Sequence, residues 1–388
     1  MSLPGGPPEQ RPGRLGVGVV GTGRVGAVLG SALRAAGHPV VAVSAISEQS
    51  RERAAALLPG VPVVDVPEVV RRAELVLLTV PDDVLADLVR GLADVGAWQL
   101  GQLVVHTSGR HGVEVLGPVR AAGAIPLALH PAMTFTGTSL DLARLEGCSF
   151  AVTAPAAVLP IGQALVVEIG GEPVVLDEGA RPLYHAALAH GANHLVVLVA
   201  QAAQALAAAG VPDPGRVLGP LLEAALDGAL RAEVPPGPDG VRGPGAVSAL
   251  TGPVRRGDPG TVAEHLRVLR DLAARTGAVD LPLTYAALAR SATQRALAAG
   301  LVQPPVAQQL VDALEAGSVP TGRDGDDTAG PGMGPAARSL DQEDGGSGQE
   351  RGAQPGGTGH DGTGHDSTDH DGTGHDSTGH HDAGEDER

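Results

Sequence analysis

The stretch that decides the fold is residues 17–26, which read Val-Gly-Val-Val-Gly-Thr-Gly-Arg-Val-Gly and lead into the apolar residues 27–33. A β-branched run therefore meets a Gly-x-Gly-x-x-Gly turn, and a helix-like segment follows. Gly21 lets the strand turn sharply, Gly23 lets backbone amides approach a pyrophosphate, and Gly26 lets the new helix pack closely on its strand. This context predicts a site for a dinucleotide cofactor.

The residues after the second expected strand bear on which dinucleotide is bound. Sites for NAD carry an acidic residue there, about 20 residues past the glycines, which binds the ribose hydroxyls. This chain has Ser44 at that position, and Arg51 and Arg53 follow it, a set that suits a 2′-phosphate; Glu48 leaves NAD open. We therefore expect NADP, with NAD as the alternative. The expected contacts are Gly21, Thr22, Gly23, Arg24, Val25, Gly26, Ser44, Val80 and Pro81.

Strand-like and helix-like runs alternate between residues 15 and 178. The expected strands are 16–20, 39–43, 75–80, 102–106, 124–130, 149–153 and 173–177, and the expected helices include 25–36, 49–58, 83–92 and 113–122. Strands that read as continuous apolar runs, with helices between them, predict a doubly wound parallel sheet covered on both faces, that is, a Rossmann-like domain. Ligands bind such sheets at the carboxyl ends of the strands, so Val80 and Pro81 are expected to border the adenosine.

After residue 178 the pattern is helical throughout. Helix-like runs at 181–209, 215–232, 261–276, 284–299 and 306–316 predict an all-α C-terminal domain over residues 179–317. Residues 1–14 and the acidic, His/Asp-rich tail at 318–388 are predicted to be disordered. The tail repeats Gly-His-Asp, which we interpret as low-complexity sequence and not as a metal site.

Composition excludes several kinds of chemistry. The chain has no lysine, which excludes a lysine acid, base or Schiff base, and its single cysteine, Cys148, excludes a disulfide framework and a Cys-rich metal site. The tail from Ser318 carries −12 of the formal charge of −17, and no basic footprint for nucleic acid remains. The longest apolar stretch, 195–210, is too short for a bilayer, which needs about 20 apolar residues. We expect a cytoplasmic protein that binds neither nucleic acid nor membrane nor metal.

Histidines are the first candidates for proton transfer, because lysine is absent. His106 and His130 each close an expected strand, so both lie toward the expected cleft; the alternative for each is to cap a helix or brace a loop. On the first helix of the second domain, steps of four place His185, Ala189 and Asn193 on one stripe. We predict His185, Asn193 and His130 as catalytic residues.

A second polar motif lies in the helical half. Arg255 and Arg256 precede the positive end of an expected helix, a suitable place to bind a substrate carboxylate through paired hydrogen bonds. His106 ends the fourth expected strand, and Ser108 follows it. These two residues complete the predicted substrate-binding set. These four residues would orient a small carboxylate beside the cofactor.

Several motifs taken together resemble one bacterial family. They are the glycine turn, Val80-Pro81-Asp82, His106-Thr107-Ser108-Gly109, His130-Pro131, Tyr184-His185 with Asn193-His194, and Thr251-Gly252-Pro253 with Arg256-Gly257-Asp258. The family joins a Rossmann-like domain to a helical domain of unknown function, DUF2520, and the resemblance covers about residues 15–316. More loosely, the chain is similar to pyrroline-5-carboxylate reductases and to the 6-phosphogluconate dehydrogenase class. The latter implies a catalytic lysine on the first helix after the Rossmann domain, a region in which this chain carries His185 and Asn193.

The leading hypothesis is an NADP-dependent oxidoreductase that reduces the C=O or C=N group of a small carboxylate. The resemblance implies ketopantoate as one candidate among the 2-oxo acids. Two alternatives are a sensor or scaffold that binds NADP without turnover and an enzyme that passes hydride between NADP and a deazaflavin. The Ala-rich helical domain also predicts close packing against a second copy, that is, a homodimer.

Overall fold

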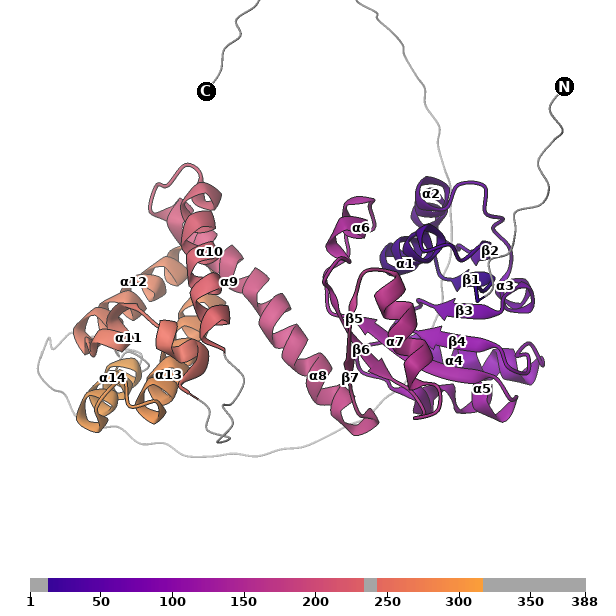
Figure 1. Cartoon of the computed structure of the whole chain (residues 1–388). Coiled ribbons are helices and arrows are strands. Elements are labelled where there is room, and N and C mark those ends of the chain that lie inside the picture. The colour runs from indigo at the N-terminus through magenta and orange to yellow at the C-terminus, as the bar shows by residue number, and fades with distance from the viewer. Residues whose placement is uncertain (1–12, 234–242, 317–388) are drawn as a thin grey trace, which may run out of the picture. The chain divides into compact units, whose positions relative to one another are not determined.

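A computed structural model describes residues 13–233 and 243–316 (Figure 1). Seven strands form one sheet in the order β2-β1-β3-β4-β5-β6-β7. All seven expected strands are confirmed, with ends shifted by at most about two residues. They are β1 (Val17–Val20), β2 (Val40–Ser44), β3 (Leu75–Leu78), β4 (Leu103–His106), β5 (Ile125–Pro131), β6 (Ser149–Thr153) and β7 (Glu172–Val175).

The sheet is mixed, whereas the sequence predicted a parallel one. Strands β1 to β5 run parallel, but β6 pairs antiparallel with β5, and β7 pairs parallel with β6. The reason is the connection after β5, which holds only the short helix α6 (Leu140–Arg144) and re-enters the sheet at the edge where β5 ended. There the amide of Ala132 donates to the carbonyl of Ser149. A strand parallel to β5 would require the chain to cross back to the end of the sheet at which β5 begins.

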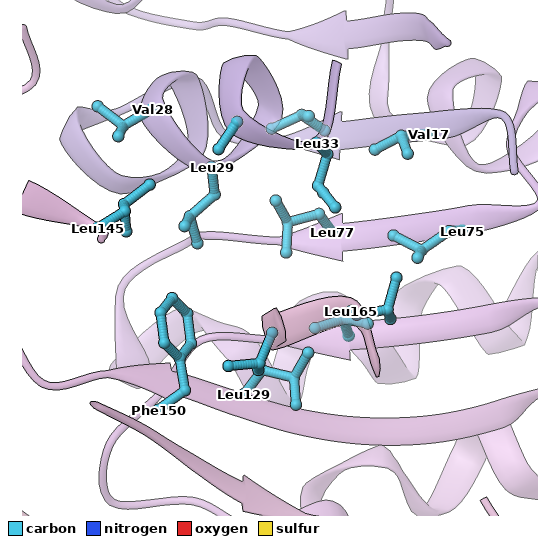
Figure 2. Packing of buried hydrophobic residues seen from close by; sticks show 14 of the residues in the cluster. Val17, Val28, Leu29, Leu33, Leu75, Leu77, Leu129, Leu145, Phe150 and Leu165 are labelled. Carbon is cyan, nitrogen blue, oxygen red and sulfur yellow. The ribbon is translucent and has the colours of Figure 1, made fainter. Parts of the chain in front are cut away.

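Helices cover both faces of the sheet. Helix α1 (Arg24–Ala35) and helix α7 (Leu159–Glu168) pack on one face, and α3 (Val66–Arg72), α4 (Asp82–Asp94) and α5 (Gly117–Ala121) pack on the other. Figure 2 shows the first of these cores, in which Leu29 and Leu33 of α1 lie near Leu77 of β3, with Phe150 and Leu165 completing the layer. Burying each such side chain stabilises the fold by about 1.5–3 kcal/mol.

Three helices of this part were not expected, namely α3, α6 and α7. Each lacks a clear helical period: α3 and α6 span only two turns or fewer, and α7 is apolar on nearly every side. Local capping supports α3, because the Asp65 side chain accepts from the amide of Glu68. Helix α2 (Glu48–Leu57) and helix α4 agree with expectation.

The remaining described residues are helical, as predicted. The helices are α8 (Arg181–Leu188), α9 (His194–Ala208), α10 (Pro214–Ala232), α11 (Gly252–Arg256), α12 (Pro259–Thr276), α13 (Asp280–Ala298) and α14 (Pro304–Ala316). Val262 and Leu266 of α12 pack against Leu310 and Leu314 of α14 in a separate core. The tail that was predicted to be disordered lies outside the described residues, as do residues 1–12. Arg14, which was also predicted to be disordered, is among the described residues, and its guanidinium forms an ion pair with Glu168 at 2.6 Å.

One continuous helical run, Glu178–Ala208, joins α8 to α9 through a π-helical turn at Ala189–Asn193. Within the described part of the chain, this is the helix whose length and hydropathy would suit a membrane span, which is weak evidence when it occurs once. None of its apolar window is buried. A π-turn widens the helix by one residue per turn, and Ala189 and Asn193 of the predicted stripe lie at its two ends.

Candidate active site

The glycine turn between β1 and α1 has the form that a dinucleotide cradle requires. Gly21 has φ +91°, and a Cβ on Gly26 would clash with the Gly21 carbonyl oxygen and the Thr79 hydroxyl. A Cβ on Gly23 would meet nothing within 4 Å. The fold itself therefore requires Gly21 and Gly26 but leaves open space at Gly23, where close approach of a ligand explains the missing side chain.

The N-terminus of α1 is open to an anion. Its N-cap residue, Gly23, provides no side-chain cap, and the first turn contains no acidic residue. The first amides of a helix have no partner within the helix, and they carry the positive end of its dipole. Val25 and Val80 are half-buried beside this turn, and Pro81 is exposed at the N-cap of α4. The turn therefore offers the free backbone amides and the positive potential that bind a pyrophosphate.

Ser44 and Thr22 have a different role from the predicted one. The Ser44 hydroxyl accepts from the Gly21 amide at 3.0 Å, and the fully buried Thr22 hydroxyl donates to the carbonyls of Ser44 and Ser50, both at 3.1 Å. These bonds tie the glycine turn to the start of α2. The Thr22 hydroxyl donates inside the protein, whereas the Ser44 hydroxyl accepts there and keeps its own hydrogen to donate.

Two arginines converge beside the turn instead. A Cβ on Gly137 would lie 2.9 Å from Nε of Arg53 and 3.0 Å from Cγ of Arg24, so both side chains lie against this one glycine. Arg24 opens α1, and Arg53 belongs to α2. The loop that carries Gly137 is held by Asp141, whose carboxylate accepts from the amides of Thr136 and Gly137, each at 2.7 Å. The result is a fixed patch of positive charge next to the cradle.

A cluster of rings lies where β5 meets α8. The Tyr184 hydroxyl oxygen lies 2.9 Å from Nδ1 of His130, and the two rings meet edge to face with centroids 5.5 Å apart. The His185 ring centroid is 6.3 Å from that of His130. A Cβ on Gly109 would lie 2.8 Å from Cδ2 of His185 and 2.9 Å from Nε2 of His130, so both histidine rings lie against this glycine. The cluster joins two predicted catalytic residues, His130 and His185.

A fully buried arginine anchors α8 beneath the cluster. Nε of Arg181 donates to the Thr153 hydroxyl at 2.8 Å, and Nη1 donates to the Ser108 carbonyl at 2.8 Å. Nη2 donates to the carbonyls of Ala128 and Ala151, at 2.9 and 3.0 Å. One guanidinium thus links the start of α8 to β5, β6 and the loop after β4, and its acceptors are neutral. Burial lowers the pKa of Arg181 to about 10, so the group stays charged at neutral pH.

His106 and Ser108, predicted to bind substrate, brace a loop. Nε2 of His106 bonds the Gly112 carbonyl at 2.8 Å, and Nδ1 accepts from the Ser108 amide at 3.2 Å. The Ser108 hydroxyl accepts from the His111 amide. Burial lowers the pKa of His106 to about 3, so the ring is neutral. The prediction differs from the structure because strand ends also need side chains that satisfy the turning backbone.

The other predicted residues lie elsewhere among the described residues. Asn193 is exposed in the π-turn, eight residues and about 12 Å along the helix from His185. Arg255 and Arg256 are exposed at the end of α11, where the Arg255 guanidinium donates to the Leu301 carbonyl. No interaction described for these three residues reaches the ring cluster.

Sequence reasoning missed two members of the site, Arg181 and Gly109, and gave Tyr184 no role. Arg181 stands at the start of a helix, where an arginine is ordinarily exposed. The scarcity of aromatic residues was a usable signal for Tyr184, because the chain has only two tyrosines. Gly109 carries no local signal, since its φ lies outside the left-handed region and its close neighbours come from β5 and α8.

Comparison with known proteins agrees with this architecture. Residues 1–131 match the family model of a Rossmann-like domain, and residues 148–292 match that of a domain of unknown function, DUF2520. No curated protein matches the sequence.

Solved structures share the fold at low identity. A Bacteroides fragilis protein, named as a proposed NADP oxidoreductase, is 22% identical with a TM-score of 0.57, over 72% of this chain and 98% of that chain. An imine reductase from Pseudomonas sp. is 20% identical with a TM-score of 0.53, over 78% and 99%. A protein from Thermotoga maritima is 21% identical with a TM-score of 0.51, over 73% and 98%. The chain thus carries, in order, a match to a Rossmann-like domain and a match to DUF2520.

Proposed function

We propose that this protein is an NADP-dependent reductase of the C=O or C=N group of a small carboxylate. The observation that carries the proposal is the shared edge of the sheet. Strands β1 and β5 run parallel, so the glycine turn after β1 and the ring cluster at the end of β5 lie at the same edge. That edge is where doubly wound sheets bind their ligands.

The residues present fit a nicotinamide dinucleotide. The open space at Gly23 and the uncapped start of α1 would hold its pyrophosphate, and Val80 and Pro81 would border the adenosine. When bound and reduced, the nicotinamide supplies a hydride, that is, two electrons and one hydrogen nucleus. The protein must supply the accompanying proton and hold the substrate, and the cluster of His130, Tyr184 and His185 offers titratable groups at this edge.

The choice of NADP over NAD now rests on Arg24 and Arg53. The Arg53 guanidinium and the stem of Arg24 meet over Gly137, so two positively charged side chains start from the same place beside the cradle and together favour an anion there. A 2′-phosphate next to the cradle meets that need, and arginine binds phosphate through paired hydrogen bonds. Glu48, exposed in the first turn of α2, is the residue that would favour NAD.

An anionic substrate is supported by the charge around the ring cluster. Arg181 places a buried positive charge below it, and the acceptors of that guanidinium are neutral. Buried charges act through a low dielectric, so this field reaches the cleft with little screening. A small 2-oxo acid fits these terms, and ketopantoate is the specific candidate we would test first. Arg255, Arg256 and Asn193 stay predictions for the remote end of the substrate.

A homodimer is part of the proposal. The run from α8 to α10 exposes many large apolar side chains, more than a soluble surface ordinarily carries in one place. They are Leu183, Leu195, Val196, Val197, Val217, Leu221, Leu226 and Leu230. A second copy that covers this surface would bury it, and a charged substitution such as Val196→Glu should then produce monomers in sedimentation experiments.

The proposal is tested by cofactor binding and turnover with one protein preparation. We expect NADPH to bind more tightly than NADH, and NADPH to be oxidised with at least one member of a panel of small 2-oxo acids and cyclic imino acids. Gly23→Ala should lose cofactor affinity yet keep the unfolding midpoint of the wild type, because a Cβ there meets no protein atom. Tight NADPH binding with no turnover on the whole panel would favour a sensor. Absence of NADPH binding would reject the proposal.

A further inference from the structure

The ring cluster offers three titratable groups, and its geometry selects one of them. We propose that Tyr184 gives the proton to the substrate and that His130 is a positioning residue, which orients the Tyr184 hydroxyl. This inference rests on the reductase function proposed above. It replaces the sequence-based prediction that His185 or His130 is the donor.

Nδ1 is the ring nitrogen of His130 for which the structure gives a hydrogen-bond partner among the described residues. Nδ1 lies 2.9 Å from the Tyr184 hydroxyl, and the Nε2 edge lies against Gly109, 2.9 Å from where a Cβ would stand. When the ring hydrogen is on Nδ1, Nε2 carries none and cannot supply a proton. His185 turns its Cδ2 edge, which carries no titratable proton, toward the same glycine. Within the His130–Tyr184 pair, the Tyr184 hydroxyl is then the group with a proton to give.

The protonation state of His130 agrees with a positioning role. Burial, with smaller contributions from the charge of Arg181 and from His185, lowers the pKa of His130 to about 4. At pH 7 about one molecule in a thousand would carry the imidazolium that a histidine acid needs. A neutral ring has one N–H. When that hydrogen is on Nδ1 it donates to the Tyr184 oxygen and leaves the phenolic hydrogen free to point at a substrate.

Tyr184 holds its proton until it is needed. Burial raises its pKa above the ordinary value of 10, while the nearby charge of Arg181 favours the phenolate and limits that rise. In the reduction, the hydride adds to the carbonyl or imine carbon, and the C=O or C=N electron pair moves to the heteroatom. That atom takes the proton from Tyr184, and the phenolate left behind accepts from Nδ1–H of His130 until water restores its proton.

The chain contains its own control for this role. Tyr285 also lies beside a histidine, with its hydroxyl 3.0 Å from Nδ1 of His265. Tyr184→Phe and Tyr285→Phe therefore remove the same groups from the two pairs. We expect Tyr184→Phe to lower kcat by about 10²–10⁴-fold while NADPH affinity and KM stay within about threefold, and Tyr285→Phe to leave kcat unchanged. Equal effects of the two variants, or a larger loss of kcat in His185→Asn than in Tyr184→Phe, would overturn the proposal.

A second measurement needs no substrate and so separates this inference from the reductase function. In the Tyr285→Phe background Tyr184 is the only tyrosine, and its phenolate absorbance can be titrated alone. The groups that act on the pair are Arg181 and His185 of α8, Asp82 of α4 and Cys148 before β6. None of them changes in the comparison of histidine variants.

The sign of the shift in this titration decides which group donates. If His130 donates to Tyr184, His130→Leu removes a bond that favours the phenolate, so the pKa of Tyr184 should rise; His130→Asn, whose amide can donate, should restore it in part. If Tyr184 donates to His130, the lost bond favoured the neutral form, and the pKa should fall. A fall would overturn the proposal even if no substrate had been found.

Discussion

The two tyrosines of this chain make nearly the same local contact in two different places. The Tyr184 and Tyr285 hydroxyls lie 2.9 and 3.0 Å from Nδ1 of a histidine, and the ring centroids are 5.5 and 5.8 Å apart. The first pair joins β5 to α8 at the carboxyl end of β5. The second joins α12 to α13, beside an apolar cavity of about 480 Å³.

What differs is the environment of each pair. Arg181 lies buried beneath the first pair, and Gly109 lies against the rings of His130 and His185. The second pair has an exposed histidine, and the arginine nearest to it in sequence, Arg267, is exposed and bonded to Glu264 and Asp271. A hydrogen-bonded His–Tyr contact is therefore not a site by itself. Buried charge and position at the sheet edge distinguish the first pair.

The largest effect should come from removing the buried charge. Arg181→Met would leave four acceptors on β5, β6 and the loop after β4 without their donor, each worth about 1–3 kcal/mol when unsatisfied. We expect the free energy of unfolding in urea to fall by about 3 kcal/mol or more. Arg267→Met, two residues from His265, should change it by less than about 1 kcal/mol because its ion pairs are exposed. Similar losses in both variants would contradict the comparison.

The buried histidines should make stability depend on pH. His106 and His130 have folded-state pKa values of about 3 and about 4, both below the ordinary 6.5, so the unfolded chain binds more protons between those values. Stability should therefore be full above about pH 7 and fall as the pH drops toward 4, by about 1.4 kcal/mol per pH unit for each histidine. Urea unfolding at several pH values measures the slope. His106→Asn should reduce it; an unchanged slope would show that His106 is not the source.

A side chain on Gly109 should disturb the first pair alone. Gly109→Ala places a Cβ within 3 Å of both His130 and His185, so we expect kcat to fall by about 10- to 100-fold with NADPH affinity retained. Gly228→Ala in α10 is the matched control, because its Cβ would meet the nearest atom at 3.7 Å, an ordinary contact. If Gly109→Ala kept wild-type turnover, the rings would not need their present spacing.

The smallest expected effect is on cofactor affinity, and it should differ between a variant at the sheet edge and one in the helical part. Arg53→Ala should weaken NADPH binding by about tenfold and leave NADH binding unchanged, since it removes one of two charges beside Gly137. Arg255→Ala, in the helical part, should leave both affinities as they are and act, if at all, on the KM of the substrate. Isothermal titration of the two cofactors measures this. Equal loss of NADPH and NADH affinity in Arg53→Ala would mean that the arginine does not read the 2′-phosphate.

Much of the fold could be predicted because its signals are local. Apolar runs of four to seven residues, separated by glycines, predicted all seven strands. The Gly-x-Gly-x-x-Gly sequence predicted the turn between β1 and α1. The direction of β6 could not be predicted, because it depends on where the chain returns after α6, and no residue in the 132–148 connection reports that. The π-turn at Ala189–Asn193 was hidden for a similar reason: its residues also fit an α-helix.

Site residues could be predicted only where the evidence for each lies in its own local sequence. Gly21 and Gly26 are explained by backbone geometry, but the partner of His130 lies 54 residues away in the chain. Ser44 was assigned to the cofactor by its distance from the glycine turn and His106 to the substrate because it ends a strand, and in the structure both side chains also hold loops. Polar residues at such ends serve the backbone first, and sequence alone does not reveal which of them remain free.

The most direct test of hydride transfer at this edge is an isotope experiment. The protein would be incubated with NADPH carrying deuterium at C4 of the nicotinamide and with a pool of small carboxylates that bear C=O or C=N groups. The masses of the products would then be measured by mass spectrometry. The account predicts an alcohol or amine product with one deuterium on the reduced carbon, formed by wild type and lost in Gly23→Ala. Bound NADPH with no deuterium in any product would contradict it.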